Sequence, residues 1–465
     1  MVCGGVPTEE VLMKKLLSLF LIGLILCSVL VGCSDKTMVD PDNPVTLTMW
    51  HVYGSQTSSP MNDLIEEFNR TSGKENGVFV KVGLVTNSDD IDLALTAGLN
   101  DEPGAYELPD LFVAYPRITE EFADGALLDF GAYFSEEELS AYRSDFLSEG
   151  YFDEQLLMLP IAKSSELIFV NKTIFDRFSA DTGITTDCFH HVEDLMSACN
   201  AYYDWSQGQT MFQINDFYHY FLTNMAGLGS EFVTDGRINV GSDAFEKAFI
   251  PIAEAGIYGG LCVGDGYASD RWKTGEIISS SGSTAGILYM RDYVTYADNT
   301  TEDIETLVLP YPCLEESKPT VIQRGGGLFA VKNEDERKNQ AAAIFAKWLT
   351  EQEHNLAFVT KAGYLPVTTQ AFQGLFANIS SVKNEKYRML YSAVNEQYAN
   401  DYQFCSLPLF DGALDAQKNF EKLIKSTLSN AHEEYIRRIQ NGENKDTVMK
   451  DLTASALASV QEALN

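Results

Sequence analysis

The chain has 465 residues, of which 45% are hydrophobic and 22% are charged. These values are typical of a folded protein that is long enough for two or three domains. Its formal net charge is −34, from 67 acidic and 33 basic residues. This charge argues against binding to nucleic acid or to anionic lipid headgroups, because both need clustered lysine and arginine.

A short apolar segment near the N-terminus ends in a cysteine. Lys14 and Lys15 precede the run 16–31, which is almost entirely Leu, Ile, Phe and Val. A positive start, about 16 apolar residues and a small residue before the end are typical of a secretory signal, and the run is short for a membrane span. Glu9 and Glu10 do not fit this pattern, so we expect translation to start at Met13.

The end of this segment, Leu30-Val31-Gly32-Cys33, resembles a bacterial lipobox. The resemblance implies that residues 1–32 are a signal peptide and that Cys33 carries a lipid on the outer face of a bacterial membrane. The alternative is an ordinary spanning helix with an incidental cysteine, but no positive stop-transfer cluster follows it. The polar stretch up to residue 44 reads as a tether, so we expect 33–44 to be a linker.

The first elements after the tether alternate between strands and a helix. Val45–Trp50 has the apolar alternation of a strand, and 78–85 and 108–114 are expected as the second and third strands. Between the first two strands, Ser59 and Pro60 form a helix start. Met61, Leu64, Ile65 and Phe68 follow at helical spacing. Strands joined by helices predict a largely parallel sheet.

The later elements are expected in the same style. They are a strand at 166–170, a helix at 172–178, mainly helix over 192–255, strands at 285–289, 305–309 and 327–331, a helix at 334–349, and a helical tail from 413 that breaks near 441–442. The chain is therefore predicted to be an α/β protein.

Four passages together carry a resemblance to a known family. They are Leu47–Phe68, Leu108–Phe112, Gly150–Phe178 and Gly325–Val367. In this order, behind a lipobox, they resemble the family 1 extracellular solute-binding proteins, the sugar-type receptors of ABC importers. The resemblance implies a two-lobed periplasmic-binding-protein-like fold, each lobe a mostly parallel sheet flanked by helices, with a multi-strand hinge and a solute in the cleft.

The resemblance also implies where the lobes divide. The first lobe is expected at 45–160 and 307–349, and the second at 161–306 and 350–465. The chain would then cross near Leu159–Lys163, return near Val308–Leu309 and cross again near Leu349–Glu353.

Candidate ligand residues in the first lobe follow from the rule that ligands lie beyond the carboxyl ends of the strands in such sheets. The rule selects Trp50, His51 and Tyr53 after the first strand and Tyr115 after the third. Aromatic faces stack on the C–H faces of sugar rings, so these residues suit a carbohydrate. The alternative for Trp50 is packing in the core beneath the first helix.

In the second lobe, the serine run 279–284 stands where the family often has Gly-x-Trp. Ser281 and Ser283 are the candidates there, although a flexible surface loop is the alternative and a stacking tryptophan is missing. The resemblance places a further ligand loop at Trp205, Gln213 and Asp216. Tyr267 and Trp272 are weaker candidates.

A glycine cluster at 323–327 suggests a different ligand chemistry. The backbone N–H groups around Gly326 can converge on an anion, and Arg324 adds a positive charge. The alternative, which the excess of acids favours, is a tight turn in which Arg324 pairs with an acidic neighbour. Tyr364, in the turn 363–367, resembles a cleft residue of the family.

The sequence contains no motif of an enzyme or of a metal site. The six histidines form no His-Glu-x-x-His pair, and the cysteines match no zinc spacing. We therefore expect no cofactor and no metal, and a monomeric, lipid-anchored receptor that delivers a carbohydrate to an ABC importer permease. The alternatives are a binder of glycerol phosphate or an acidic sugar, a sensory receptor of the same fold, and a lipid-anchored glycoside hydrolase, whose two acids need only meet in space.

Overall fold

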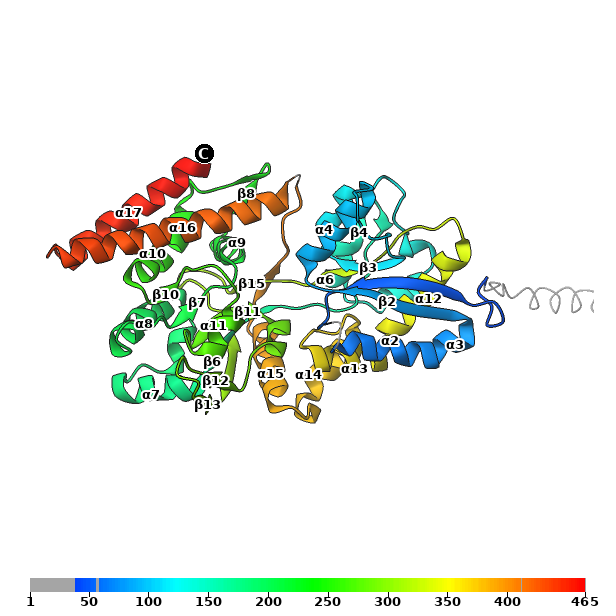
Figure 1. Ribbon diagram of the computed structural model, residues 1–465, viewed down its shortest axis with the longest axis horizontal. Coiled ribbons are helices and arrows are strands. Elements are labelled where there is room, and N and C mark those ends of the chain that lie inside the picture. Colours follow the sequence, from blue (N-terminus) through cyan, green and yellow to red (C-terminus); the bar gives the residue numbers. More distant parts are fainter. Residues whose placement is uncertain (1–37, 56–57, 411, 465) are drawn as a thin grey trace, which may run out of the picture.

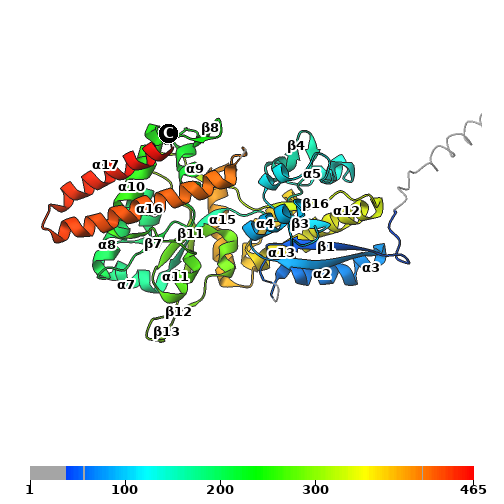
Figure 2. The ribbon, with the colours of Figure 1, turned by 45° about the horizontal axis from the view of Figure 1, so that its top comes forward.

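The computed structural model describes residues 38–55, 58–410 and 412–464. It contains two lobes, each built on a central sheet with helices on both faces (Figure 1). Figure 2 shows the same two lobes from a second direction, with the hairpin of the last two helices on the outside of the second lobe. The two-lobed α/β fold predicted from the sequence is confirmed. The predicted signal peptide and Cys33 lie outside the described residues.

The first lobe is organised by a four-stranded sheet of order β16-β3-β1-β2. Its strands are β1 (Val45–His51), β2 (Val78–Val85), β3 (Leu111–Ala114) and β16 (Gly327–Ala330). β1 is parallel to β2 and to β3, and β16 runs antiparallel to β3. The three parallel strands therefore direct their carboxyl ends toward one edge of the sheet.

Helices cover both faces of this sheet. α2 (Pro60–Arg70), α12 (Glu336–Thr350) and α13 (Gln352–Ala362) cover one face, and α4 (Ser88–Leu99) covers the other. The remaining short helices of this part are α3 (Ser72–Asn76), α5 (Glu136–Ser140), α6 (Ser144–Leu147) and α14 (Thr369–Ala377).

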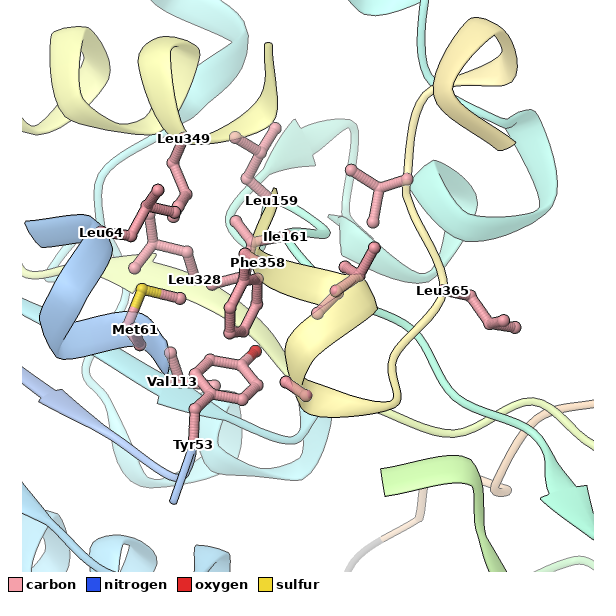
Figure 3. Packing of buried hydrophobic residues seen from close by; sticks show 14 of the residues in the cluster. Tyr53, Met61, Leu64, Val113, Leu159, Ile161, Leu328, Leu349, Phe358 and Leu365 are labelled. Carbon is pink, nitrogen blue, oxygen red and sulfur yellow. The ribbon is translucent and has the colours of Figure 1, made fainter. Parts of the chain in front are cut away.

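The helix start predicted from the sequence is confirmed in α2. The Ser59 side chain accepts hydrogen bonds from the backbone N–H groups of Met61 and Asn62, and Pro60 occupies the first turn. The four apolar residues at helical spacing in α2 are all buried. Figure 3 shows two of them, Met61 and Leu64, packed with side chains of β3, β16, α12 and α13.

The second lobe is organised by a five-stranded sheet of order β10-β7-β11-β6-β14. Its strands are β6 (Glu166–Asn171), β7 (Phe212–Gln213), β10 (Leu261–Cys262), β11 (Ser279–Ser283) and β14 (Thr306–Pro310). β7 is parallel to β10 and β11, whereas β6 is antiparallel to both β11 and β14. This sheet is therefore mixed.

The serine run forms β11, a central strand of this sheet. The strand expected at 285–289 was wrong, because the strand lies directly before that range. Residues 284–288 form a 3-10 helix, η5, directly after β11. Two of the buried serines of β11 have hydroxyl groups that are satisfied by other parts of the chain. Ser279 donates to the carbonyl of Met211, and Ser281 accepts from the N–H of Asn215.

The helices of the second lobe pack around this sheet and against one another. They are α7 (Lys172–Thr182), α8 (Val192–Trp205), α9 (Phe217–Gly227), α10 (Asp243–Tyr258), α11 (Ala268–Thr274), α15 (Glu385–Ala399), α16 (Ala413–Gln440) and α17 (Lys445–Leu464). α16 and α17 form the helical hairpin visible at the upper left of Figure 1. The break expected near residues 441–442 is confirmed.

Four two-stranded ladders complete the structure of the described residues. They are β4 (Tyr151–Phe152) with β5 (Gln155–Leu156), β8 (Val233–Thr234) with β9 (Arg237–Ile238), β12 (Tyr293–Thr295) with β13 (Thr301–Asp303), and β15 (Thr320–Ile322) with β17 (Gln403–Cys405). The last of these pairs two segments that lie between the lobes.

The chain passes from the first lobe to the second along residues 159–165, whereas the other two expected crossings were misplaced. β14 pairs with β6 of the second sheet, so the return comes after residue 310 and leads to β16. No crossing occurs near Leu349–Glu353 because α13 still packs on the first lobe, where Phe358 contacts Tyr53. The chain leaves this lobe between α14 and α15, and the rest of the division into lobes stays a prediction.

The expected linker is shorter than 33–44. Val39 is buried in the core of the first lobe, and the N–H of Met38 donates to the side-chain oxygen of Gln340. Asp40 and Asn43 then form a tight turn before β1 begins at Val45. Residues 38–44 are therefore part of the first lobe.

Candidate functional site

A cavity of about 580 Å³ lies between the two lobes. The loops after β1, β2 and β3 form its first-lobe side, and β11 with the 3-10 helix η5 forms part of its second-lobe side. The segments around Ser164 and Arg324, which connect the lobes, lie between these two walls. The cavity is therefore located where the strand-end rule predicts a ligand.

The lining of this cavity is mostly uncharged and rich in hydroxyl groups. Its five tyrosines are Tyr53, Tyr115, Tyr267, Tyr289 and Tyr364, and its other polar side chains include Thr86, Asn87, Ser88, Ser164, Asn215, Ser269 and Ser283. Among the described lining residues, Arg324 is the only one with a formal charge. Such a lining combines ring faces with many neutral hydrogen-bonding groups.

Three tyrosines form the inner part of the cavity. The ring of Tyr53 packs edge-on against Tyr364, with 5.1 Å between the ring centroids, and against Phe358 at 4.8 Å. Burial raises the pKa values of both Tyr53 and Tyr364, so their hydroxyl groups stay protonated at neutral pH. Tyr115 lies at the end of β3, and the guanidinium of Arg117 lies 5.0 Å from its ring centroid.

Two further tyrosines on the second lobe are largely exposed. Tyr267 is 66% exposed and Tyr289 is 49% exposed, although both line the cavity. They come from the residue before α11 and from the end of η5. Exposed aromatic faces at a cavity are available to a ring-shaped ligand.

Two residues predicted after the first strand lie outside this cavity. Trp50 is buried with Ile91 and Leu95 of α4, and its ring packs edge-on against Tyr106. His51 is fully buried; its Nδ1 accepts the N–H of Tyr53, so its Nε2 donates to Asn62 at 2.8 Å. Burial lowers the pKa of His51 to about 4, and the ring is neutral. Neither residue lines the cavity, and His51 holds the backbone of Tyr53 in place.

The predicted ligand residues of the second lobe are dispersed. Trp205 packs against Phe178 and donates its ring N–H to Asp181, and Gln213 donates to the carbonyl of Gly266. Neither lines the cavity.

Ser281 and Asp216 lie behind the cavity wall. Ser281 is buried and fixes the backbone of Asn215, which does line the cavity. Asp216 caps α9. Ser283 is the predicted serine that reaches the cavity directly.

The glycine cluster serves close packing between chain segments. A Cβ atom on Gly326 would lie 2.3 Å from the carbonyl oxygen of Ala114, and one on Gly325, whose φ is +104°, would lie 2.8 Å from the carbonyl oxygen of Ala162. The carbonyl of Gly325 accepts the Lys163 ammonium at 3.1 Å. The cluster therefore lets the returning segment pass close to two others, as the alternative from the sequence proposed.

The connecting segments are hydrogen-bonded side by side. Ser164 and Arg324 exchange backbone hydrogen bonds of 2.8 and 2.7 Å, and the N–H of Gln323 donates to Cys405 at 2.7 Å. On the other side, Lys163 and Leu365 exchange two more. This arrangement forms a continuous ladder of four segments between the lobes.

One carboxylate joins this ladder to the first lobe. Lys163 has no exposed side-chain surface, and its ammonium lies 2.5 Å from Glu149. The other carboxylate oxygen of Glu149 accepts from Gln323 and, at 2.6 Å, from Ser406. Glu149 therefore contacts three separate segments that run between the lobes.

A cluster of buried acids lies behind Arg324. Its guanidinium is 3.5 Å from Glu166, the first residue of β6, and it also bonds the side chain of Tyr115. Glu166 is 1% exposed, and burial, partly offset by Arg324, raises its pKa to about 7. Asp216 and Glu421 lie beside it; burial and the charge of Asp216 raise the pKa of Glu421 to about 8, so Glu421 holds the proton and Asp216 stays ionised.

Several lining residues were not predicted. Thr86, Asn87 and Ser88 follow β2, so the same strand-end rule could have found them. Asn215, Ser269 and Tyr289 depend on how the second sheet is ordered, and no local pattern signals them.

The described residues contain no group of three or more His, Cys, Asp or Glu side chains placed to hold a metal ion. No helix in this part of the chain is long and apolar enough to cross a membrane.

Comparison with solved structures supports the fold. The cyclic alpha-maltosyl-1,6-maltose binding protein of Arthrobacter globiformis is 16% identical, with a TM-score of 0.62 over 90% of this chain and 100% of that one. UgpB of Mycobacterium tuberculosis, in complex with glycerophosphocholine, is 16% identical, with a TM-score of 0.63 over 91% and 100%. An ABC substrate-binding protein of Listeria monocytogenes, in complex with cycloalternan, is 12% identical, with a TM-score of 0.62 over 90% and 100%.

No curated protein matches the chain significantly. The family described as bacterial extracellular solute-binding protein matches residues 63–386, which is more than half of the chain. The two lobes, the ladder between them and the cavity at the strand ends are consistent with this match. The chain therefore belongs to the family of bacterial extracellular solute-binding proteins.

Proposed function

We propose that this protein captures a carbohydrate in the cavity between its lobes and delivers it to the permease of an ABC importer. The observation that carries the proposal is the lining: five tyrosines, many neutral hydroxyl and amide groups, and a single charged side chain among the described lining residues. Tyrosine rings stack on sugar C–H faces, and neutral polar groups bond sugar hydroxyls. The volume is in the range of small-molecule sites, about 300–1,000 Å³.

The ladder of segments between the lobes, acting as a hinge, supports the proposed delivery to a permease. A solute that touches both walls favours a closed arrangement of the lobes by its differential contacts, and a membrane partner can recognise that arrangement. The lipobox at Leu30–Cys33 supports a lipid anchor that keeps the receptor at the outer face of the membrane.

The cavity favours a receptor over a glycoside hydrolase. Hydrolysis of a glycosidic bond generally requires two carboxyl groups that flank the bond. Among the described residues that line the cavity, none is Asp or Glu. Glu166, the nearest buried acid in the cluster behind Arg324, is 1% exposed and lies behind the lining.

The test is thermal unfolding of the chain from Ser34 onward in the presence of neutral oligosaccharides, uronates, glycerol phosphates, amino acids and short peptides. A solute at one hundred times its Kd should stabilise the fold by about 2.7 kcal/mol. For a chain of this length, this corresponds to a rise in Tm of about 3 °C. We expect the shift with at least one oligosaccharide, and a shift with amino acids or peptides alone would refute the carbohydrate class.

A matched pair of variants tests the cavity. Tyr289 lines it and Tyr293 does not, yet the two side chains are similarly exposed, at 49% and 44%. Tyr289→Ala should weaken binding of the oligosaccharide about tenfold or more, because stacking and area burial are lost. Tyr293→Ala should leave the Kd unchanged. Equal effects of the two substitutions would place the solute elsewhere.

A further inference from the structure

The surroundings of Arg324 bear on the charge of the solute that the cavity can bind. Arg324 is the one charged side chain among the described lining residues, and its side chain is 19% exposed. Glu166 lies 3.5 Å from one of its terminal nitrogens, and the side chain of Tyr115 is bonded to it. The guanidinium is therefore engaged both by the second lobe and by the first.

The acids behind Arg324 supply at least as much negative charge as Arg324 supplies positive charge. Asp216 is ionised, and Glu166, whose pKa burial raises to about 7, adds a partial negative charge at neutral pH. His219, which lies 3.3 Å from Asp216, does not add a cation, because burial lowers its pKa to about 4. An approaching anion thus meets an arginine whose charge is already compensated.

Neutralisation of Arg324 by neighbouring acids weakens its attraction for an anion. This effect is larger inside the protein than at its surface. The interaction between two charges falls with distance and with the local dielectric constant. Glu166 lies 3.5 Å from the guanidinium of Arg324, and Asp216 also acts on that guanidinium electrostatically. The net charge of −34 adds a repulsive field at long range.

We infer that the cavity selects uncharged solutes over their anionic counterparts, and that Glu166 and Asp216 set this selectivity by neutralising Arg324, which in turn positions Tyr115. The inference rests on the proposed function, and it narrows the solute to a neutral carbohydrate. It also replaces the alternative of an acidic sugar or a glycerol phosphate.

The experiment compares two forms of one sugar by isothermal titration calorimetry. The probes are a neutral trisaccharide that binds the wild-type protein and the same trisaccharide with its terminal hydroxymethyl group oxidised to a carboxylate, with glycerol 3-phosphate as a third probe. The wild-type protein should bind the neutral form at least about tenfold more tightly than either anion. Equal or tighter binding of an anion would overturn the inference.

Two variants then test the assignment to these acids. Glu166→Gln keeps the shape of the side chain, and Asp216→Asn keeps a residue that can cap α9. Each should narrow the ratio of the two Kd values by about tenfold, mainly by tighter binding of the oxidised sugar. Glu254→Gln, which removes an exposed acid of α10 outside the cavity, should leave the ratio unchanged.

The outcomes separate this inference from the function on which it rests. If the ratio of the Kd values for the neutral and the oxidised sugar stays the same in both variants, the roles of Glu166 and Asp216 are refuted. Binding of the oxidised sugar, with no neutral sugar bound at all, would overturn the selectivity but keep the cavity as a carbohydrate site. Failure of every carbohydrate to bind would overturn the proposed function itself.

Discussion

The contact between Glu149 and Lys163 offers a strong test of how the lobes are connected. The Lys163 side chain has no exposed surface, and Glu149 is 15% exposed. Glu149→Gln would leave the Lys163 ammonium buried without its counter-charge, with only the neutral oxygens of the new amide and of the Gly325 carbonyl as acceptors. Removing one partner of a buried ion pair costs about 3–5 kcal/mol. For a chain of this length, Tm changes by about 1 °C per kcal/mol, so the expected fall in Tm is about 3–6 °C.

Differential scanning calorimetry of the solute-free protein measures this fall. Glu316→Gln is the matched control, because it breaks the pair with Lys247, in which both side chains are exposed, and it should leave the Tm unchanged. The double variant Glu149→Gln with Lys163→Met removes both charges and should recover part of the loss. A Tm change for Glu149→Gln no larger than that of Glu316→Gln would refute the reasoning.

Three further predictions follow from single contacts. Trp50→Ala should lower the free energy of unfolding by about 3–5 kcal/mol and leave the solute Kd unchanged; loss of binding at unchanged stability would contradict its place in the core. Because the pKa of His51 is about 4 when folded and 6.5 when exposed, its stabilising contribution is complete above pH 6.5 and is lost as the pH falls toward 4. The Tm of His51→Asn should therefore fall less steeply than that of the wild type over this range, and parallel curves would count against it. Ser281→Ala removes the acceptor of the Asn215 N–H and should cost about 1 kcal/mol in chemical denaturation, whereas Ser280→Ala, whose hydroxyl has no partner among the described residues, should cost less.

The elements that the sequence predicted well are those specified by local chemistry. In α2, the cap at Ser59 and the spacing of the apolar residues depend only on neighbours within two turns. The sequence did not predict the serine strand β11, for the opposite reason. The hydroxyl groups of Ser279 and Ser281 are satisfied by Met211 and Asn215, which lie about seventy residues away in the chain, and no local periodicity predicts these contacts.

The cavity residues divide in the same way. The strand-end rule selected Tyr53 and Tyr115, and both line the cavity because the carboxyl ends of parallel strands share one edge. It placed Trp50 with them because alternation along a strand shows that successive side chains point to opposite faces, but not that α4 covers the second face. Tyr289 follows a strand whose neighbours come from distant segments, so its position required the structure.

The burial of Val39 has a consequence for how this receptor meets its membrane partner. The first lobe is fixed from Met38 onward, so five residue steps separate it from Cys33. Even a fully extended chain spans only about 17 Å over that length. If Cys33 is acylated, as we propose, the near end of the first lobe stays within about 17 Å of the lipid surface. Its search for the permease becomes a two-dimensional one, at a high effective concentration and with one end of the first lobe always toward the lipid.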